Sequence, residues 1–291
     1  MSVLEETKYL MKKYKIKANK SLGQNFLIDD TVIEDIVNGA NITKNDLVIE
    51  IGPGLGSMTA LLVEKAKKVI CIELDKKMIQ ILNDRFIAYN NIEIINEDVL
   101  KIDLNSLIEK EKKENEIHNV KIVANLPYYI TTPIIMKLLE ENLDIESITV
   151  MIQKEVADRL IEIPSGKNTG AITYTVFYYC EPEKIREVEN TSFVPMPEVT
   201  SEVISLKLRK EPAVKVENKK VFFNIIKSAF MQRRKTLINA LVNTGVFTSK
   251  EEGARTLKTL NLKEDIRAET LTIEDFARIS NYFCDNIKKD K

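Results

Sequence analysis

A glycine-rich turn after an apolar run is the first feature of this sequence suited to holding a small molecule. Gly52, Gly54 and Gly56 follow residues 47–51 in a G-x-G-x-G pattern, and Glu50 stands just before them. Glycines allow a tight turn and let a ligand approach the backbone. The pattern lacks the G-x-G-x-x-G of dinucleotide sites and the G-K-[ST] of phosphate-binding loops. It therefore predicts a nucleoside ligand without a pyrophosphate.

Acidic residues follow the next two apolar runs. Glu73 lies 21 positions after Gly52, where an acidic residue accepts the ribose hydroxyls in nucleotide-binding folds of this kind. Asp98 follows the third apolar run and is expected at the same edge of the sheet, where its carboxylate can accept the amino group of an adenine. We therefore expect the glycine loop, Glu50, Glu73 and Asp98 to form one cofactor site, together with Leu74, Val99 and Asn125.

The tetrapeptide Asn125-Leu126-Pro127-Tyr128 ends a fourth apolar run and is suited to presenting a purine amino group to an electrophile. The lone pair of such an amine is delocalised into the ring, so an enzyme must favour the tetrahedral nitrogen. The amide oxygen of Asn125 and the carbonyl of Leu126 can accept its two N–H groups. Pro127 has no N–H that would repel the amine, and Tyr128 can stack on a base swung out of its helix. The pattern predicts methyl transfer without a general base.

These residues must be positioned by the elements around them. From residue 47, short β-rich runs alternate with helix-like stretches, which is typical of a parallel α/β fold with right-handed crossovers. We therefore expect a seven-stranded, mostly parallel sheet. Its predicted strands are residues 47–51, 69–74, 92–96, 121–126, 147–153, 171–182 and 201–209.

Beyond residue 209 the character of the chain changes. A polar, proline-bearing stretch is followed only by helical patterns, at residues 221–242, 249–260 and 272–287. We predict a catalytic domain over residues 1–210, with a basic N-terminal segment at residues 1–20, and a small all-α domain over residues 211–291.

Several classes of protein are disfavoured by composition. His118 is the single histidine, and Cys71, Cys180 and Cys284 have no paired spacing, so we expect no metal site, no disulfide framework and no serine-hydrolase chemistry. No apolar stretch approaches the roughly 20 residues of a membrane helix, and the N-terminus lacks a signal-peptide run. We expect a cytoplasmic monomer that does not enter a membrane.

The net charge of −1 conceals two basic ends. Residues 206–291 contain 19 lysines and arginines against 11 acidic residues, and residues 1–20 contain six lysines against two glutamates. Residues 21–205 are correspondingly acidic, with a net charge of −13. This distribution favours a polyanion at the two ends and a small molecule in the middle.

Motifs in the sequence resemble one family of enzymes. The tetrapeptide at 125–128 resembles the [DN]-x-P-[YF] signature of amino-methyltransferases, and the predicted cofactor site resembles that of Rossmann-like class I methyltransferases. Residues 21–27, SLGQNFL, are similar to the LGQNFL segment of rRNA adenine dimethyltransferases, and residues 193–199, FVPMPEV, to their F-x-P-x-P-x-V loop. Residues 229–237 are similar to the F-x-x-R-R-K-T-L helix of the KsgA/Dim branch. The likeness extends from residue 18 to about residue 280.

The resemblance implies roles for further residues. In the family, the residues matching Asn25 and Leu27 close over the cofactor, and we include Gln24 with them. Phe193 is implied to stack on the face of the target adenine opposite Tyr128. Phosphate contacts in the helical domain are assigned to Arg233, Arg234 and Lys235.

The resemblance also implies the reaction. The methyl donor would be S-adenosylmethionine, and the product N6,N6-dimethyladenosine at two adjacent positions in the 3′-terminal hairpin of small-subunit (16S) rRNA, late in subunit assembly. Two alternatives stay open. One is the related 23S rRNA dimethyltransferase of macrolide resistance, which the RRKTL segment disfavours. The other is a non-catalytic RNA-binding or assembly factor, as in the related mitochondrial transcription factors, which the intact Glu50, Asp98 and Asn125 disfavour.

Overall fold

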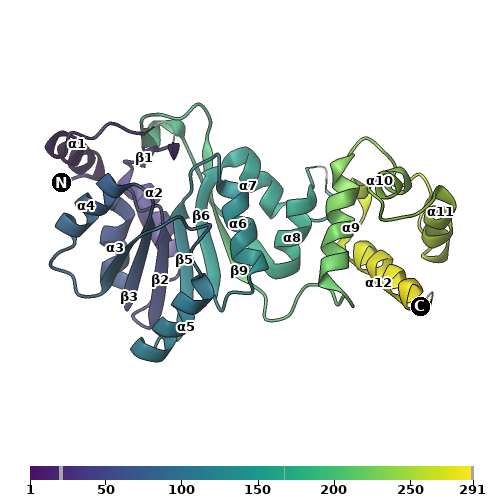
Figure 1. Cartoon of the computed structure of the whole chain (residues 1–291). Helices are drawn as coiled ribbons and strands as arrows, with labels where there is room; N and C mark the ends of the chain where they lie inside the picture. Colours follow the sequence, from purple (N-terminus) through teal and green to yellow (C-terminus); the bar gives the residue numbers. More distant parts are fainter. Residues whose placement is uncertain (20–21, 167, 290–291) are drawn as a thin grey trace. The chain divides into compact units, whose positions relative to one another are not determined.

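The computed structural model describes residues 1–19, 22–166 and 168–289, which fold into two compact units (Figure 1). One unit consists of Met1–Ala157 and Pro182–Leu208. The other consists of Asp158–Glu181 and the described part of Arg209–Lys291. Residues 158–181, which the sequence pattern placed with the catalytic part, thus belong to the helical unit. Lys20 and Ser21, in the predicted N-terminal segments, lie outside the described residues.

The first unit is built on a seven-stranded sheet. The first five strands in the spatial order are parallel, and β9 runs antiparallel to β6. The prediction of a seven-stranded, mostly parallel sheet is confirmed. In spatial order, the strands are β4 (Ile92–Asn96), β3 (Lys68–Glu73), β2 (Asp46–Ile51), β5 (Asn119–Asn125), β6 (Ser147–Gln153), β9 (Ser201–Leu208) and β7 (Cys180–Val188).

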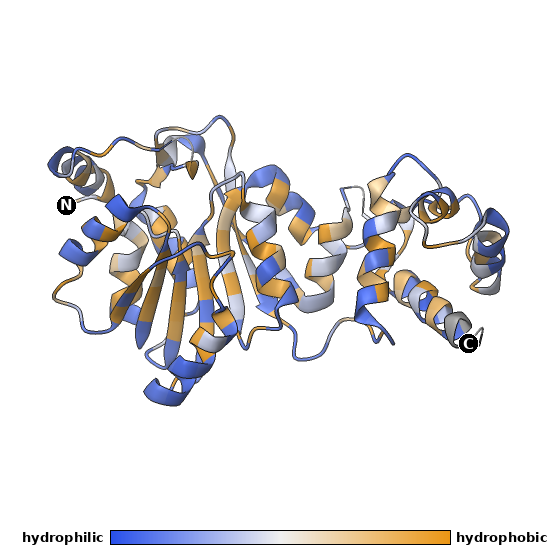
Figure 2. Cartoon of the chain, viewed as in Figure 1, coloured by the Kyte–Doolittle hydropathy of each residue, from blue (hydrophilic) through white to orange (hydrophobic). Residues whose placement is uncertain are grey.

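Helices cover both faces of this sheet. Right-handed crossovers place α3 and α4 on the face that also carries α2, and α5 and α6 on the opposite face. All six residues of β2 are buried, so this strand is covered on both faces of the sheet, and Figure 2 shows the middle of the sheet largely hydrophobic. The helices of this unit are α2 (Asp30–Gly39), α3 (Ser57–Lys65), α4 (Lys76–Arg85), α5 (Leu104–Asn115) and α6 (Thr131–Glu140), and α7 (Lys154–Ile161) begins in this unit and ends in the second.

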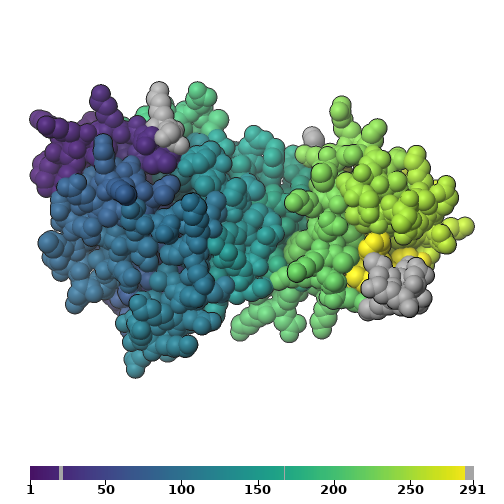
Figure 3. Space-filling model, in the orientation of Figure 1, coloured from purple at the N-terminus to yellow at the C-terminus, as the bar shows by residue number. Residues whose placement is uncertain are grey.

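The N-terminal helix α1 (Val3–Lys13) supports the glycine loop. Leu10 packs in one apolar cluster with Leu55 of that loop and with residues of α4, and Figure 3 shows the N-terminal segment against the body of the first unit. The guanidinium group of Arg85 donates both to the carbonyl of Leu55 and, at 2.7 Å, to the carboxylate of Glu6. The N-terminal segment therefore helps to fix the loop.

A separate two-stranded sheet joins two distant segments of the chain. In it, β1 (Phe26–Leu27) runs antiparallel to β8 (Phe193–Val194), with Leu27 opposite Phe193. Ser192 extends the connection, because its hydroxyl donates to Asp29 at 3.1 Å and its carbonyl accepts from Ile28 at 2.9 Å. The segment before α2 and the segment carrying Phe193 are thereby held side by side.

The second unit is helical, as predicted. Its core contains Tyr174, Phe222 and Phe276, and the Tyr174 hydroxyl donates to the Leu271 carbonyl at 2.6 Å. No helix in the described ranges is long and apolar enough to cross a bilayer. The elements are α8 (Ala171–Tyr179), α9 (Lys219–Met231), α10 (Leu237–Asn243), α11 (Lys250–Thr259), η3 (Ala268–Thr270) and α12 (Ile273–Lys289).

Two local predictions are wrong. Residues 171–179 form a helix and not a strand, because their aromatic and β-branched side chains are buried on most sides and pack against α9. The pattern at residues 221–242 also does not form one helix. It breaks after Met231, and Thr236 caps the next helix by accepting the N–H of Asn239. The expected basic helix is therefore a basic turn.

Candidate active site

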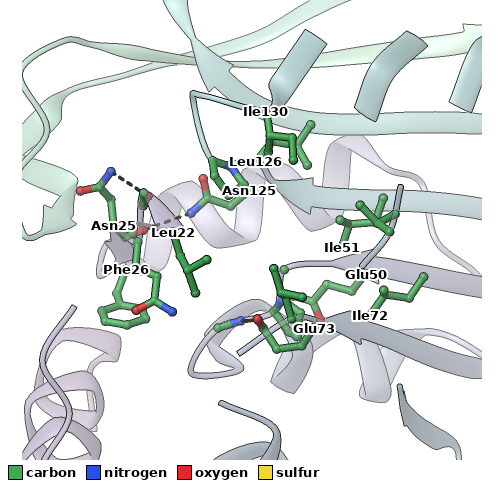
Figure 4. A pocket seen from close by; sticks show the side chains of 18 of the residues that line it. Leu22, Asn25, Phe26, Glu50, Ile51, Ile72, Glu73, Asn125, Leu126 and Ile130 are labelled. Carbon is green, nitrogen blue, oxygen red and sulfur yellow. Dashed lines mark hydrogen bonds between the residues drawn. The ribbon is translucent and has the colours of Figure 1, made fainter. Parts of the chain in front are cut away.

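One pocket at the carboxyl ends of the parallel strands contains most of the predicted site residues (Figure 4). It encloses about 1210 Å³, including its opening to solvent. The predicted residues that line it are Gln24, Asn25, Leu27, Glu50, Gly52, Gly54, Glu73, Leu74, Asp98, Val99, Asn125, Leu126, Pro127, Tyr128 and Phe193.

The glycine loop requires its glycines for conformation. Gly52, Gly54 and Gly56 have φ values of 69°, 58° and 82°, in the left-handed region that side chains disfavour. A Cβ at Gly56 would also lie 2.7 Å from a ring atom of Phe86. Gly56 therefore lets the loop pack against the end of α4, and it is not among the residues lining the pocket.

Glu50 places an unpaired oxygen at the pocket. Its Oε2 accepts the hydroxyl of Thr59 at 2.6 Å and lies 3.5 Å from the Cys71 sulfur, while its Oε1 is buried without a hydrogen-bond partner among the described residues. Burial raises the pKa of Glu50 to about 7. An unpaired buried acceptor is costly, so the site suits a ligand that brings a donor or a positive charge.

This burial predicts a measurable pH dependence of stability. Because the folded pKa of about 7 exceeds the ordinary 4.5, folding favours the protonated acid, and the stability contributed by Glu50 falls as pH rises from 4.5 through 7. Glu50→Gln should therefore raise the unfolding free energy of the ligand-free protein at pH 8, by up to about 3 kcal/mol. The gain should be mostly lost at pH 5.

Denaturant unfolding at the two pH values measures this effect, with Glu64→Gln on the surface of α3 as the matched control. An equal change at pH 5 and pH 8 would contradict the assignment to Glu50.

The carboxylate of Glu73 is held rigidly at the end of β3. Its Oε2 accepts the N–H of Gly54 at 3.2 Å and its Oε1 that of Asp75 at 2.8 Å, and burial raises its pKa. Each oxygen retains a lone pair that can accept a ribose hydroxyl. At the end of β4, Asp98 accepts the N–H of Leu100 at 3.0 Å. Both acids therefore stand where the sequence places them.

The segment before α2 forms the opposite wall of the pocket. Leu22, Asn25 and Phe26 face Glu50 and Glu73 across it (Figure 4). Gln24 anchors the segment by donating to Asp75 at 2.9 Å, and the Asn125 side-chain nitrogen donates to the Asn25 carbonyl at 3.4 Å. Because the Asn125 nitrogen makes this bond, its amide oxygen faces another direction and is left to accept from a substrate.

The turn after β5 is fixed by its own hydrogen bonds. The N–H of Leu126 donates to the Met151 carbonyl at 3.1 Å, and the Pro127 carbonyl accepts from Ile130 and from the Thr131 hydroxyl. Phe193, which is only 3% exposed, reaches the same pocket from β8. The turn and β8 thus bring polar acceptors and aromatic rings to the same pocket.

Sequence reasoning missed several residues of the site. Asp75 holds both Gln24 and the start of α4, and its signal was an acidic residue directly before a helix. Several residues that line the pocket were also not predicted, and the sequence indicates them only because they lie next to motif residues. They include Phe26, Leu55, Met58, Glu97, Tyr129 and Ile130.

The basic triplet lies in the second unit. Arg233, Arg234 and Lys235 occupy the exposed turn between α9 and α10 and are not among the residues lining the pocket. Arg233 donates to the carbonyl of Thr169 at 3.1 Å, so its side chain also has a structural contact. Among the described residues, no cluster of histidine, cysteine or acidic side chains is arranged for a metal ion.

The seven-stranded sheet, with a pocket at the carboxyl ends of its parallel strands, defines a class I methyltransferase fold, and this fold implies S-adenosylmethionine as methyl donor. The unpaired Glu50 oxygen fits a cationic donor of this kind. The chain belongs to the ribosomal RNA adenine dimethylase family, whose model matches residues 15–285.

Individual relatives agree with the family. The chain is 49% identical over 275 residues to the ribosomal RNA small subunit methyltransferase A of Alkaliphilus metalliredigens, covering 94% of this chain and 95% of that protein. It is 47% identical to the protein of the same name from Clostridium botulinum (strain Langeland), with 96% and 98% covered. The crystal structure of a dimethyladenosine transferase from Plasmodium falciparum aligns with a TM-score of 0.75 at 25% identity, and the alignment covers 89% of this chain and 98% of that one. The 23S rRNA methyltransferase ErmE shares the fold, with a TM-score of 0.67 at 22% identity and 89% and 100% covered.

Proposed function

We propose that this protein dimethylates N6 of two adjacent adenosines in the 3′-terminal hairpin of 16S rRNA, in the cytoplasm and late in small-subunit assembly. The observation that carries the proposal is the convergence of Asn125, Tyr128 and Phe193 on the pocket that also contains the glycine loop. Near-full-length similarity to proteins named small subunit methyltransferase A supports the small subunit as the substrate.

The cofactor end of the pocket has a distinct role for each acid. Glu73, fixed by two backbone N–H groups, accepts the ribose hydroxyls, and Asp98 accepts the adenine amino group. Glu50, whose Oε1 has no hydrogen-bond partner among the described residues, would accept a hydrogen bond or a positive charge from the donor. Gln24, Asn25 and Leu27 cover the donor from the opposite wall. When bound, S-adenosylmethionine supplies an electrophilic methyl group.

The other end of the pocket orients the amine. The Asn125 amide oxygen and the Leu126 carbonyl accept the two N–H groups of the adenine, which turns the nitrogen lone pair toward the donor. Tyr128 and Phe193 hold the two faces of the extruded base. After the first transfer the nitrogen carries a positive charge and loses a proton to water, and the amine can then be methylated again.

A direct assay tests the proposal. The protein is incubated with labelled S-adenosylmethionine and unmethylated small or large ribosomal subunits, and the RNA is digested to nucleosides. We expect labelled N6,N6-dimethyladenosine from small subunits. Label confined to large subunits would identify the macrolide-resistance activity. Binding to small subunits without label would identify a non-catalytic assembly factor.

The basic turn should contribute to RNA affinity through phosphate contacts. Arg234→Gln and Lys235→Gln should each weaken binding to the small subunit and reduce the absolute value of the negative slope of log K against log salt by about 1. Filter binding at several salt concentrations measures both quantities. Lys110→Gln on α5, which contributes no residue to the pocket, is the control. An unchanged slope in both variants would show that these side chains do not contact phosphates.

A further inference from the structure

Ser201 lies at the end of the segment that begins with Phe193, and it contacts Tyr128. It is the first residue of β9 and is fully buried. Its Oγ is 2.7 Å from the phenolic oxygen of Tyr128, a residue 73 positions earlier in the chain. The position of Ser201 is fixed by the sheet, because β9 pairs with β6 and places Ser201 opposite Gln153.

The backbone around Tyr128 is fixed, but its ring needs a separate anchor. The hydrogen bonds to the Pro127 carbonyl and from the Leu126 N–H hold the turn, yet they leave the ring free to rotate about its two side-chain torsions. A hydrogen bond at the far tip of the ring removes most of that freedom. The tip of Tyr128 makes this bond with Ser201, a side chain belonging to the central sheet.

We infer that Ser201 is a positioning residue for methyl transfer, whose hydroxyl holds the Tyr128 ring in the orientation in which the target base stacks. The inference rests on the proposed function, since it takes Tyr128 as the stacking residue. Residues 193–201 then contact the base at one end and position its stacking partner at the other. Phe193 at one end of the segment reaches the pocket itself, and Ser201 at the other end secures the opposing ring.

The hydrogen bond between Tyr128 and Ser201 is suited to positioning the ring as well as to stabilising the core. Tyr128 is half-buried at the pocket, and burial raises the pKa of its hydroxyl, which therefore stays neutral and able to donate or accept. A phenylalanine would supply the same stacking surface. The tyrosine hydroxyl is consequently the part of the side chain that depends on Ser201, and removing either hydroxyl should have the same effect.

A double-mutant cycle tests this positioning role. Ser201→Ala and Tyr128→Phe each remove one partner, and each should lower kcat/KM for unmethylated small subunits about fivefold, the magnitude of one hydrogen bond. The double variant should lose no more than either single variant. The KM for S-adenosylmethionine should stay within twofold of the unmutated value.

Controls separate positioning from general damage. Ser205→Ala makes the same change four residues along β9, on the same face of the strand, and should leave kcat/KM unchanged. Thermal unfolding of every variant checks that it is folded. Multiplicative losses in the double variant, or unchanged kinetics in Ser201→Ala, would overturn the inference. Tyr128→Ala tests the proposed function separately, because full activity in that variant would remove the stacking role of Tyr128 whatever Ser201 does.

Discussion

Alanine at position 125 should lower kcat for methyl transfer by about 10²–10³-fold, the usual effect of removing one polar group that acts on the transition state. The amide oxygen of Asn125 is the side-chain acceptor at the turn after β5, and without it the adenine amine keeps its lone pair in conjugation with the ring. Donor affinity should change only a few-fold, because the Glu73 and Asp98 contacts are untouched. Single-turnover methylation of small subunits and equilibrium binding of S-adenosylmethionine measure the two quantities.

The same strand offers a matched control. Asn119 lies at the other end of β5 and donates to the buried carboxylate of Asp46 at 3.2 Å. Asn119→Ala should lower the unfolding free energy by about 1 kcal/mol and leave kcat unchanged. Near-normal turnover in Asn125→Ala would rule out the proposed orientation of the amine.

Alanine at position 73 should weaken S-adenosylmethionine binding by about 100-fold or more, since hydrogen bonds to a charged group are worth roughly 1.5–3 kcal/mol each. Two effects combine. The ribose loses its acceptors, and the N–H groups of Gly54 and Asp75 lose the carboxylate that holds the glycine loop to the start of α4. Calorimetric titration with the donor measures the change. At saturating donor, kcat should fall much less than the affinity.

Two further variants make this result specific. Glu73→Gln keeps one acceptor oxygen and should show an intermediate loss. Glu93→Ala, in the neighbouring strand, removes an acid that pairs with Lys68 outside the pocket, and it should bind the donor normally. Donor affinity within twofold of normal in Glu73→Ala would exclude this carboxylate from the cofactor site.

The predictable parts of the site are those governed by local pattern. Strand ends are visible in the sequence, and parallel strands bring their carboxyl ends to one edge of a sheet. The sequence alone therefore predicts that Gly52, Glu73, Asp98 and Asn125 lie together, as they do in the pocket. The sheet itself follows from the same alternation of apolar runs and amphipathic stretches.

The parts that could not be predicted depend on distant segments meeting. Nothing local to Ser201 indicates its contact with Tyr128, and nothing near Arg85 indicates that it bonds to both Glu6 and the Leu55 carbonyl. The prediction for residues 171–179 failed for a different reason. Their composition favours a strand, but burial against several helices overrides local propensity.

The pairing of Leu27 with Phe193 gives a physical route for coupling between the proposed donor site and the proposed base site. In the proposed function Leu27 covers the methyl donor and Phe193 reaches the target base, and the pairing of their strands means that ordering one favours the ordering of the other. If bound donor changes the affinity for RNA by some factor, bound RNA must change the affinity for the donor by the same factor. A base that receives two methyl groups needs two donor molecules in succession, and each exchange of spent for fresh donor therefore changes, for that interval, how tightly the RNA is held.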